Sequence, residues 1–163
     1  KQISQFFNSP KAKVPDRKRA TILRTKNELI IYPMSKTTTG IGIATEPVLH
    51  LNISETPDKI VEGIFNAFAS NQFDLPHPGQ SEWKDFDRQY LKSIGFKSHY
   101  ELHKNSICVS LEKHDKKLIF TPTINKIAKK TWSDLSSKST EVLIDATTEN
   151  IVHVLNVTFE NCE

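Results

Sequence analysis

Two short motifs hold residues whose types and spacing could do chemistry. The stretch Thr38–Pro47, TTGIGIATEP, begins like a glycine-rich phosphate loop, and His99–His103, HYELH, places two histidines four residues apart. A dinucleotide fingerprint needs a third glycine leading into a helix, and a P-loop ends in Gly-Lys-Ser/Thr. Neither follows Gly42, because IATEPVLHL is typical of a strand. We therefore expect Gly40 and Gly42 to mark a strand entrance or bulge, and not a nucleotide site.

The histidine pair and the cysteines give little support for metal or covalent chemistry. Histidines at i and i+4 of a helix can bind zinc, but the glutamate is misplaced for H-E-x-x-H and no third ligand lies nearby. We expect His99 and His103 to lie on a solvated helix face. Cys108 sits in the apolar run ICVSL, which predicts a small core residue, and no G-x-S-x-G elbow occurs. The sequence thus predicts no catalytic residues, no metal and no cofactor, and no enzyme.

An acidic segment around the turn PHPGQ is the candidate partner-binding site. Its carboxylates can stabilise the start of a helix, or they can form a rim that meets a basic partner. Both interpretations stay open, and we expect Trp83 to anchor this helix in the core. The candidate partner-binding residues are Asp74, His77, Glu82, Asp85 and Asp87.

Composition favours a soluble protein of the cytoplasm. The chain has 163 residues, 37% of them hydrophobic, two cysteines without paired spacing, and no apolar run long enough to span a membrane. The net charge of +3 divides into +7 for residues 1–26 and −4 for residues 27–163. The basic end is either a solvated terminus or a nucleic-acid contact.

The elements that must position these residues follow from periodicity and turn formers. Strands are expected at 20–25, 28–33, 41–45, 48–52 and 106–112, and helices at 57–70, 81–94 and 98–104. Ser54 or Thr56 can cap the first helix and Ser81 the second, which Gly95 should end.

The last third of the chain repeats the first. VLHLNISETPDKIVEGIFNAF aligns with EVLIDATTENIVHVLNVTF at an offset of 91, and LIIYP aligns with LIFTP at an offset of 89. We therefore predict an α+β fold, mainly antiparallel, built from two sheet-plus-helix repeats. The whole chain, 1–163, is expected to be one domain with four parts: a basic segment (1–19), repeat one (20–70), a helical insertion (71–105) and repeat two (106–163).

The order of several segments resembles the CdiI-type immunity proteins of bacterial contact-dependent growth inhibition. These are GIGIATEPVLHLNISETPDKIVEGIFNAF, the PHPG loop with SEWKDFDRQYLKSIGFKS, and SICVSLEKHDKKLIFTPT. The resemblance covers about residues 20–163 and rests on the order of segments, because no single motif is very specific. The paired repeats also resemble the arrangement of Whirly single-stranded DNA-binding proteins, at the level of the fold alone.

The immunity-protein resemblance implies a non-enzymatic antidote. Such a protein binds the C-terminal toxin domain of a cognate CdiA-type effector as a one-to-one heterodimer and covers its active site or substrate surface. In related systems the toxin is commonly a nuclease, often one that attacks RNA, so a mildly acidic body suits the role. The alternative is a single-stranded nucleic-acid-binding module that uses the basic N-terminal segment, although a Lys-Gly-rich contact motif is not visible.

Overall fold

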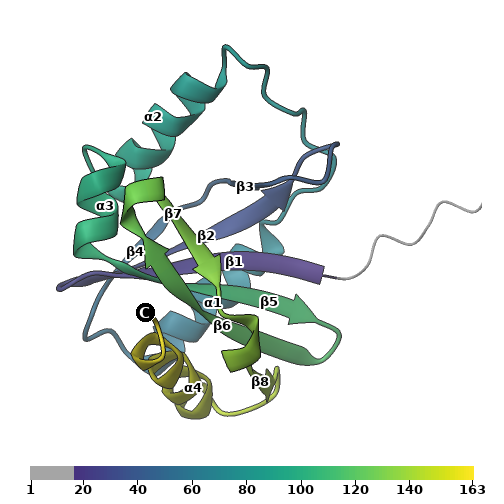
Figure 1. The fold of residues 1–163 in the computed structure, drawn as a ribbon. Helices are drawn as coiled ribbons and strands as arrows, with labels where there is room; N and C mark the ends of the chain where they lie inside the picture. The colour runs from purple at the N-terminus through teal and green to yellow at the C-terminus, as the bar shows by residue number, and fades with distance from the viewer. Residues whose placement is uncertain (1–16) are drawn as a thin grey trace, which may run out of the picture.

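The computed structural model describes residues 17–163, so residues 1–16 of the expected basic segment lie outside it (Figure 1). Eight strands and four α-helices follow one another in that part of the chain. The first half contains β1 (Arg17–Arg24), β2 (Glu28–Lys36), β3 (Gly42–Ala44), β4 (Leu49–Asn52) and α1 (Pro57–Ala69). The insertion contains α2 (Trp83–Ile94) and α3 (His99–Asn105). The second half contains β5 (Ile107–His114), β6 (Lys117–Lys126), β7 (Thr131–Asp134), β8 (Thr140–Leu143) and α4 (Thr148–Glu160).

The predicted repeat is present element by element. Strands β4 and β8 start at residues 49 and 140, and helices α1 and α4 start at residues 57 and 148, so each pair is 91 residues apart. β1 and β5 have eight residues each and begin 90 residues apart, at 17 and 107. Both halves therefore use the same order of strands followed by one long helix, and the predicted α+β class is confirmed.

One antiparallel sheet joins the two halves. Its order is β3-β2-β1-β5-β6-β7, with β4 paired to β2 and β8 paired to β6. The first strands of the two halves pair with each other along their full length, from Arg17 opposite His114 to Arg24 opposite Ile107. The junction between the repeats is thus an uninterrupted ladder of backbone hydrogen bonds in the middle of the sheet.

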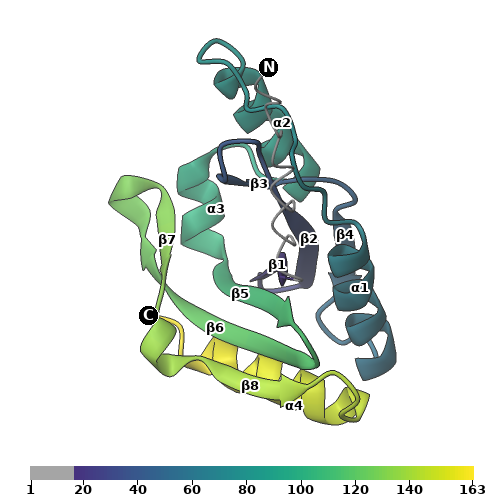
Figure 2. The ribbon, with the colours of Figure 1, turned by 90° about the vertical axis from the view of Figure 1, so that its right-hand side faces the viewer.

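Alternation along β1 and β5 sends successive side-chain pairs to opposite faces of the sheet. The cross-strand pair Ile22–Val109 belongs to the core under α1 and α4. The next pair, Leu23–Cys108, faces the other way and packs with Ile94 of α2 and Leu102 of α3. Figures 1 and 2 show α1 and α4 along one face and the insertion helices at one end of the opposite face.

The insertion differs from the prediction in how it meets the sheet. Ile94 is the one buried residue of α2, and Trp83 stays partly exposed, so the expectation that Trp83 anchors the core is wrong. The helix starts at Trp83, two residues after Ser81, with Glu82 at the N-cap and no side-chain cap, so Ser81 does not cap it. Gly95 ends the helix as predicted, with a left-handed φ of 83°.

Several predicted boundaries shift by a few residues. β1 begins at Arg17, so the expected border between a basic segment and the first repeat at residue 20 cuts a strand. Thr56 occupies the N-cap of α1 but its side chain accepts no cap hydrogen bond, whereas the equivalent Thr147 accepts one from the Asn150 amide. The two repeats are therefore more alike in backbone structure than in the hydrogen bonds that cap their helices.

Core packing under α4 gives a stability prediction. The Phe159 ring is 2% exposed, and the Arg24 guanidinium carbon lies 4.5 Å from its centroid. Phe159→Ala should lower the free energy of unfolding by about 3–5 kcal/mol, because it leaves a cavity between α4 and β1. Val157→Ala, on the exposed side of the same helix, is the control and should change it by less than about 1 kcal/mol. Urea unfolding measures both, and equal losses would contradict this account of the core.

Candidate binding cavity on the open face of the sheet

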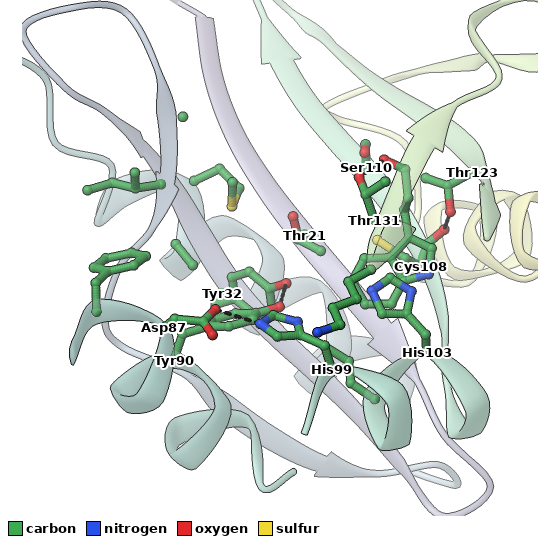
Figure 3. Close-up of a pocket in the computed structure, with 18 of the residues that line it drawn as sticks. Thr21, Tyr32, Asp87, Tyr90, His99, His103, Cys108, Ser110, Thr123 and Thr131 are labelled. Carbon is green, nitrogen blue, oxygen red and sulfur yellow. Dashed lines mark hydrogen bonds and ion pairs between the residues drawn. The ribbon is translucent and has the colours of Figure 1, made fainter. Parts of the chain in front are cut away.

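The face of the sheet opposite α1 and α4 is only partly covered, and a cavity of about 350 Å³ lies on the uncovered part. β1, β2 and β5 supply its floor through Thr21, Tyr32, Cys108 and Ser110. One wall comes from α2 and α3, and the other comes from β7 and the turn before it. Figure 3 shows Asp87 and Tyr90 on one side, and Ser110 and Thr123 on the other.

A hydrogen-bonded pair joins α2 to α3 at the first wall. An Asp87 carboxylate oxygen and His99 Nε2 lie 2.6 Å apart, and this contact links two helices that share few buried residues (Figure 3). The ring of Tyr90 lies nearly parallel to that of His99, with the two centroids 6.4 Å apart and an interplanar angle of 27°. The carboxylate is therefore held in a fixed position at the cavity, with its second oxygen accepting no hydrogen bond from residues 17–163.

Two tyrosines connect this wall to the floor. The hydroxyls of Tyr32 and Tyr90 lie 2.9 Å apart, and their rings meet edge to face at 5.7 Å. One hydroxyl donates to the other, so one proton of the pair is left to donate elsewhere. Burial is the main cause that raises the pKa of both phenols, and it brings the pKa of Tyr90 to about 12. Both groups are thus neutral donors at physiological pH.

His103 is buried, and a hydrogen bond to Asn125 fixes the orientation of its ring. The side chain is 2% exposed, and its Nδ1 lies 2.8 Å from the Asn125 Oδ1. The amide nitrogen of Asn125 donates to the His103 carbonyl at 2.7 Å, which assigns Oδ1 as the acceptor for the ring. Nδ1 therefore carries a proton, and in the neutral ring Nε2 carries the lone pair. The expected solvated histidine face is wrong, because His103 lies in the interior.

Trp132 of β7 covers this histidine. The two ring centroids are 3.9 Å apart with an interplanar angle of 30°, so the indole stacks on the imidazole. The Trp132 Nε1 is buried and has no acceptor among the described residues. An unpaired buried donor destabilises a fold by about 1–3 kcal/mol. The cavity thus contains a polar group that the fold itself leaves unsatisfied.

The turn into β7 brings two opposite charges to the second wall. Lys130 has a left-handed φ of 54°, a conformation that costs a non-glycine residue about 1–3 kcal/mol. Its exposed side chain lines the cavity, and no carboxylate of residues 17–163 lies within ion-pair distance of its Nζ. Asp134 accepts a hydrogen bond from the Ser110 hydroxyl at 2.7 Å through one carboxylate oxygen. Its other oxygen has no donor among the described residues.

Cys108 lies at the bottom of the cavity, and its thiol is unreactive near neutral pH. The residue is 4% exposed, as the sequence predicted for a core position. Burial raises the pKa of its thiol well above the usual range, so the thiolate needed for nucleophilic attack is not formed near neutral pH. Thr123 donates its hydroxyl to the Cys108 carbonyl at 2.7 Å, which fixes the backbone there.

The sequence-predicted site residues on α2 separate onto two faces. Asp87 points to the cavity and bonds to His99. Asp85 precedes it by two residues, which is about half a turn around the helix, and pairs with Arg88 at 3.3 Å on the exposed side. Trp83 and Tyr90 share the face of Asp87. The helix therefore divides the predicted acidic cluster, and one of its carboxylates reaches the cavity.

The remaining predicted residues lie on the loop before α2. His77 Nδ1 is 3.0 Å from the Thr39 hydroxyl, so the PHPG loop contacts the turn that contains Gly40. Glu82 accepts from the Gly79 amide at 3.3 Å and stabilises the loop locally. Asp74 is exposed with φ of 61°. None of these three side chains lines the cavity, and their binding role stays a prediction.

Several cavity residues were not identified from the sequence. They come from the floor and from the second repeat, namely Tyr32, Lys130, Trp132 and Asp134. The sequence KTWSD contains a signal that could have found two of them, because alternation on a short strand puts Trp132 and Asp134 on one side. The pairing of this strand with β6 decides that the side faces the cavity.

Other functional classes receive no support from residues 17–163. In that range no group of three or more His, Cys, Asp or Glu side chains is placed to hold a metal ion. Gly40 adopts φ of 84° in the turn before β3, and Gly42 begins that strand, which confirms the prediction of a strand entrance. None of the helices in the described part of the chain is long and apolar enough to cross a membrane.

Comparison with known proteins identifies the fold. No protein-family model matches the sequence, and no curated protein matches it. A protein of unknown function from Neisseria meningitidis is similar in structure, with a TM-score of 0.71 and 16% identity over 90% of this chain and 96% of that chain. A chain of the CdiA-CT/CdiI toxin and immunity complex from Yersinia pseudotuberculosis is similar with a TM-score of 0.69 and 12% identity, over 90% of this chain and 98% of that chain. The fold of this chain is thus also found in these two solved structures.

The buried tyrosine pair gives a prediction for alkaline pH. An ordinary tyrosine titrates near pH 10, whereas Tyr90 has a pKa of about 12 and that of Tyr32 is also raised. Tyr90→Phe should therefore leave the rise in absorbance at about 295 nm between about pH 9 and 11 unchanged, and should remove amplitude above it. If the variant instead lost part of the absorbance rise between about pH 9 and 11, the burial of Tyr90 would be contradicted.

The same shifts set the sign of a stability change. The folded protein keeps phenol protons that the unfolded chain releases, so the free energy of unfolding should fall as pH rises from about 10 to 12. The fall should be less steep in Tyr90→Phe, because that variant lacks one of the two shifted groups. Chemical denaturation at several pH values measures both slopes.

Proposed function

We propose that this protein is an immunity protein, which binds and neutralises the toxin domain of a contact-dependent growth inhibition system. The observation that carries the proposal is the shared fold, over nine-tenths of both chains, with a chain of the toxin and immunity complex from Yersinia pseudotuberculosis. Neutralisation is stoichiometric, through a one-to-one complex that covers the active site or the substrate surface of the toxin. The protein acts in the cytoplasm of the producing bacterium.

The chemistry of the cavity supports a binding role over a catalytic one. The Asp87–His99 pair resembles half of a catalytic triad, but its hydrogen bond serves to hold α2 against α3. The one thiol at the cavity, that of Cys108, is buried with a raised pKa. Aromatic side chains at the cavity are instead the residue types that dominate binding energy in protein interfaces.

We further propose that the cognate toxin is a nuclease, and most simply an RNase. A nuclease must present basic side chains to phosphates, and an inhibitor that occupies that surface needs acceptors. The cavity offers free carboxylate oxygens on Asp87 and Asp134, and aromatic rings beside them. This arrangement suits a basic surface on the partner.

The arginines of β1 do not favour the alternative of nucleic-acid binding. Arg17 and Arg19 both pair with Glu112, at 3.7 and 3.3 Å, and Arg24 lies over the Phe159 ring. These contacts hold three cations of the basic stretch 1–26 against the protein. The contribution of residues 1–16 stays a prediction, because they lie outside the described part of the chain.

Co-expression tests the proposed function directly. The probe is the C-terminal domain of the large surface protein that the gene adjoining this one should encode. We expect that domain to arrest growth of a laboratory bacterium, the present chain alone to be harmless, and both together to restore growth. Purified mixtures should give a one-to-one complex by size-exclusion chromatography with light scattering.

A mismatched toxin domain from another contact-dependent system is the control, and it should remain toxic in the presence of this chain. Growth arrest by the present chain alone would overturn the proposal. So would the absence of an adjoining toxin gene, or protection that continues when this chain is present far below the toxin concentration.

A further inference from the structure

The open cavity contains more acceptor capacity than its own residues use. Asp87 and Asp134 lie on opposite walls. Each accepts one hydrogen bond through one carboxylate oxygen, Asp87 from His99 and Asp134 from Ser110. The second oxygen of each has no donor among residues 17–163. A carboxylate can accept about four hydrogen bonds, so both groups are ready to bind an external donor.

Aromatic rings surround these acceptors. Trp83, Phe86 and Tyr90 line the α2 wall, and Trp132 lines the β7 wall. The face of an aromatic ring attracts a cation, and a guanidinium can stack on a ring while it donates to a carboxylate in its own plane. An ammonium group cannot stack in this way, and an anion would meet both the ring faces and the two carboxylates unfavourably.

Lys130 is the charge that opposes a cation in this cavity. The two carboxylates and this lysine carry two negative charges and one positive charge. Lys130 is exposed and has no ion-pair partner among the described residues, so its long side chain can turn toward solvent when another cation enters. The two carboxylates are held by His99 and Ser110 and cannot do the same.

The unpaired indole N–H of Trp132 sets a second requirement for a ligand of this cavity, which must bring a hydrogen-bond acceptor. A guanidinium has no acceptor atom, so it cannot satisfy this donor. The main chain that carries an arginine does have one, because each residue brings a carbonyl oxygen. A protein segment with an arginine therefore matches both the free carboxylate oxygens and the unsatisfied N–H, whereas a free small cation matches only the first.

We propose that this cavity is the anchor site for the toxin, and that it receives an arginine side chain from a segment of the toxin surface. The inference rests on the proposed function and assigns its interface to the open face of the sheet. The guanidinium lies between the aromatic walls and donates to the free oxygen of Asp134, Asp87 adds negative charge on the opposite wall, and a neighbouring carbonyl accepts from Trp132. A second groove, of about 420 Å³, shares Thr21, Met34 and Asp134 with the cavity and continues across the sheet, which gives room for the rest of the segment.

The test compares two carboxylates with different positions. Asp134→Asn removes the charge at the cavity with little change in shape, and Asp85→Asn removes one on the opposite side of α2, where the side chain pairs with Arg88. We expect Asp134→Asn to weaken binding of the adjoining-gene toxin domain by about tenfold or more. Asp85→Asn should weaken it by less than about twofold. Thermal unfolding of both variants checks that the fold is retained.

Intrinsic fluorescence gives a second readout. The chain has two tryptophans, Trp83 and Trp132, and both line the cavity. Toxin binding should therefore change the emission, and Trp132→Phe should remove a large part of that change. Because phenylalanine keeps an aromatic ring but lacks the N–H, this variant should also bind more weakly than the wild type.

A double-mutant cycle identifies the partner residue. Each arginine and lysine of the toxin domain is changed to alanine and paired with Asp134→Asn. One arginine should show coupling, so that the double variant binds about as weakly as the more damaging single variant.

The outcomes separate this inference from the proposed function. If the wild type binds the toxin but Asp134→Asn behaves like Asp85→Asn, or if the coupled toxin residue is a lysine, the anchor site is wrong and the immunity function stands. If Asp85→Asn is the more damaging change, the interface lies on the outer side of α2. If the wild type does not bind the toxin domain at all, both proposals fail.

Discussion

The antiparallel pairing of β1 with β5 is the contact on which the rest of this structure depends. It joins two similar halves in one sheet, with Ile22 opposite Val109 on one face and Leu23 opposite Cys108 on the other. Because the halves share an order of elements, α1 and α4 both pack on the Ile22 side. That arrangement completes one core and leaves the opposite face of the central strands without a repeat helix. The insertion between the halves is the part of the chain that covers it.

The insertion covers this face incompletely, and the cavity is the result. Ile94 and Leu102 close the end near the β1–β2 turn, while α2 extends away from the sheet with its aromatic side chains partly exposed. Specific polar contacts hold the helix at this angle, chiefly the bond from Asp87 to His99 and the bond between the Tyr32 and Tyr90 hydroxyls. A wall that is fixed by directional contacts keeps its aromatic rings in place without burying them. Such preorganised rings lose little conformational freedom on binding.

The two walls of the cavity come from different parts of the chain and differ in chemistry. The α2 and α3 side belongs to the insertion, and the Trp132 side belongs to the second repeat, where a short strand pairs with the end of β6. Variation in one wall can therefore change the shape or charge of the cavity while the central sheet stays the same. This is the organisation that a binding protein needs when a common scaffold must recognise different partners.

The sequence by itself determined the scaffold. Hydrophobic periodicity predicted the helix found at Pro57–Ala69, and Gly95 predicted the end of α2. The offset between matching segments predicted the repeat and with it the helix found at Thr148–Glu160. These features are local, or they recur in the chain, so they can be recognised from the sequence alone. Cys108 could be placed in the core for the same reason, because an apolar alternating strand must bury one face.

Only the tertiary structure decided the cavity. Asp87 and Asp85 are equivalent in sequence, and the rotation of α2 relative to the sheet separates them. His103 was expected on a solvated face, and the β6–β7 hairpin buries it by bringing Asn125 and Trp132 against its ring. Contacts between residues more than twenty positions apart depend on how elements pack. No local pattern encodes that packing, because the same side chain is favourable on a surface or in a cavity according to what lies opposite.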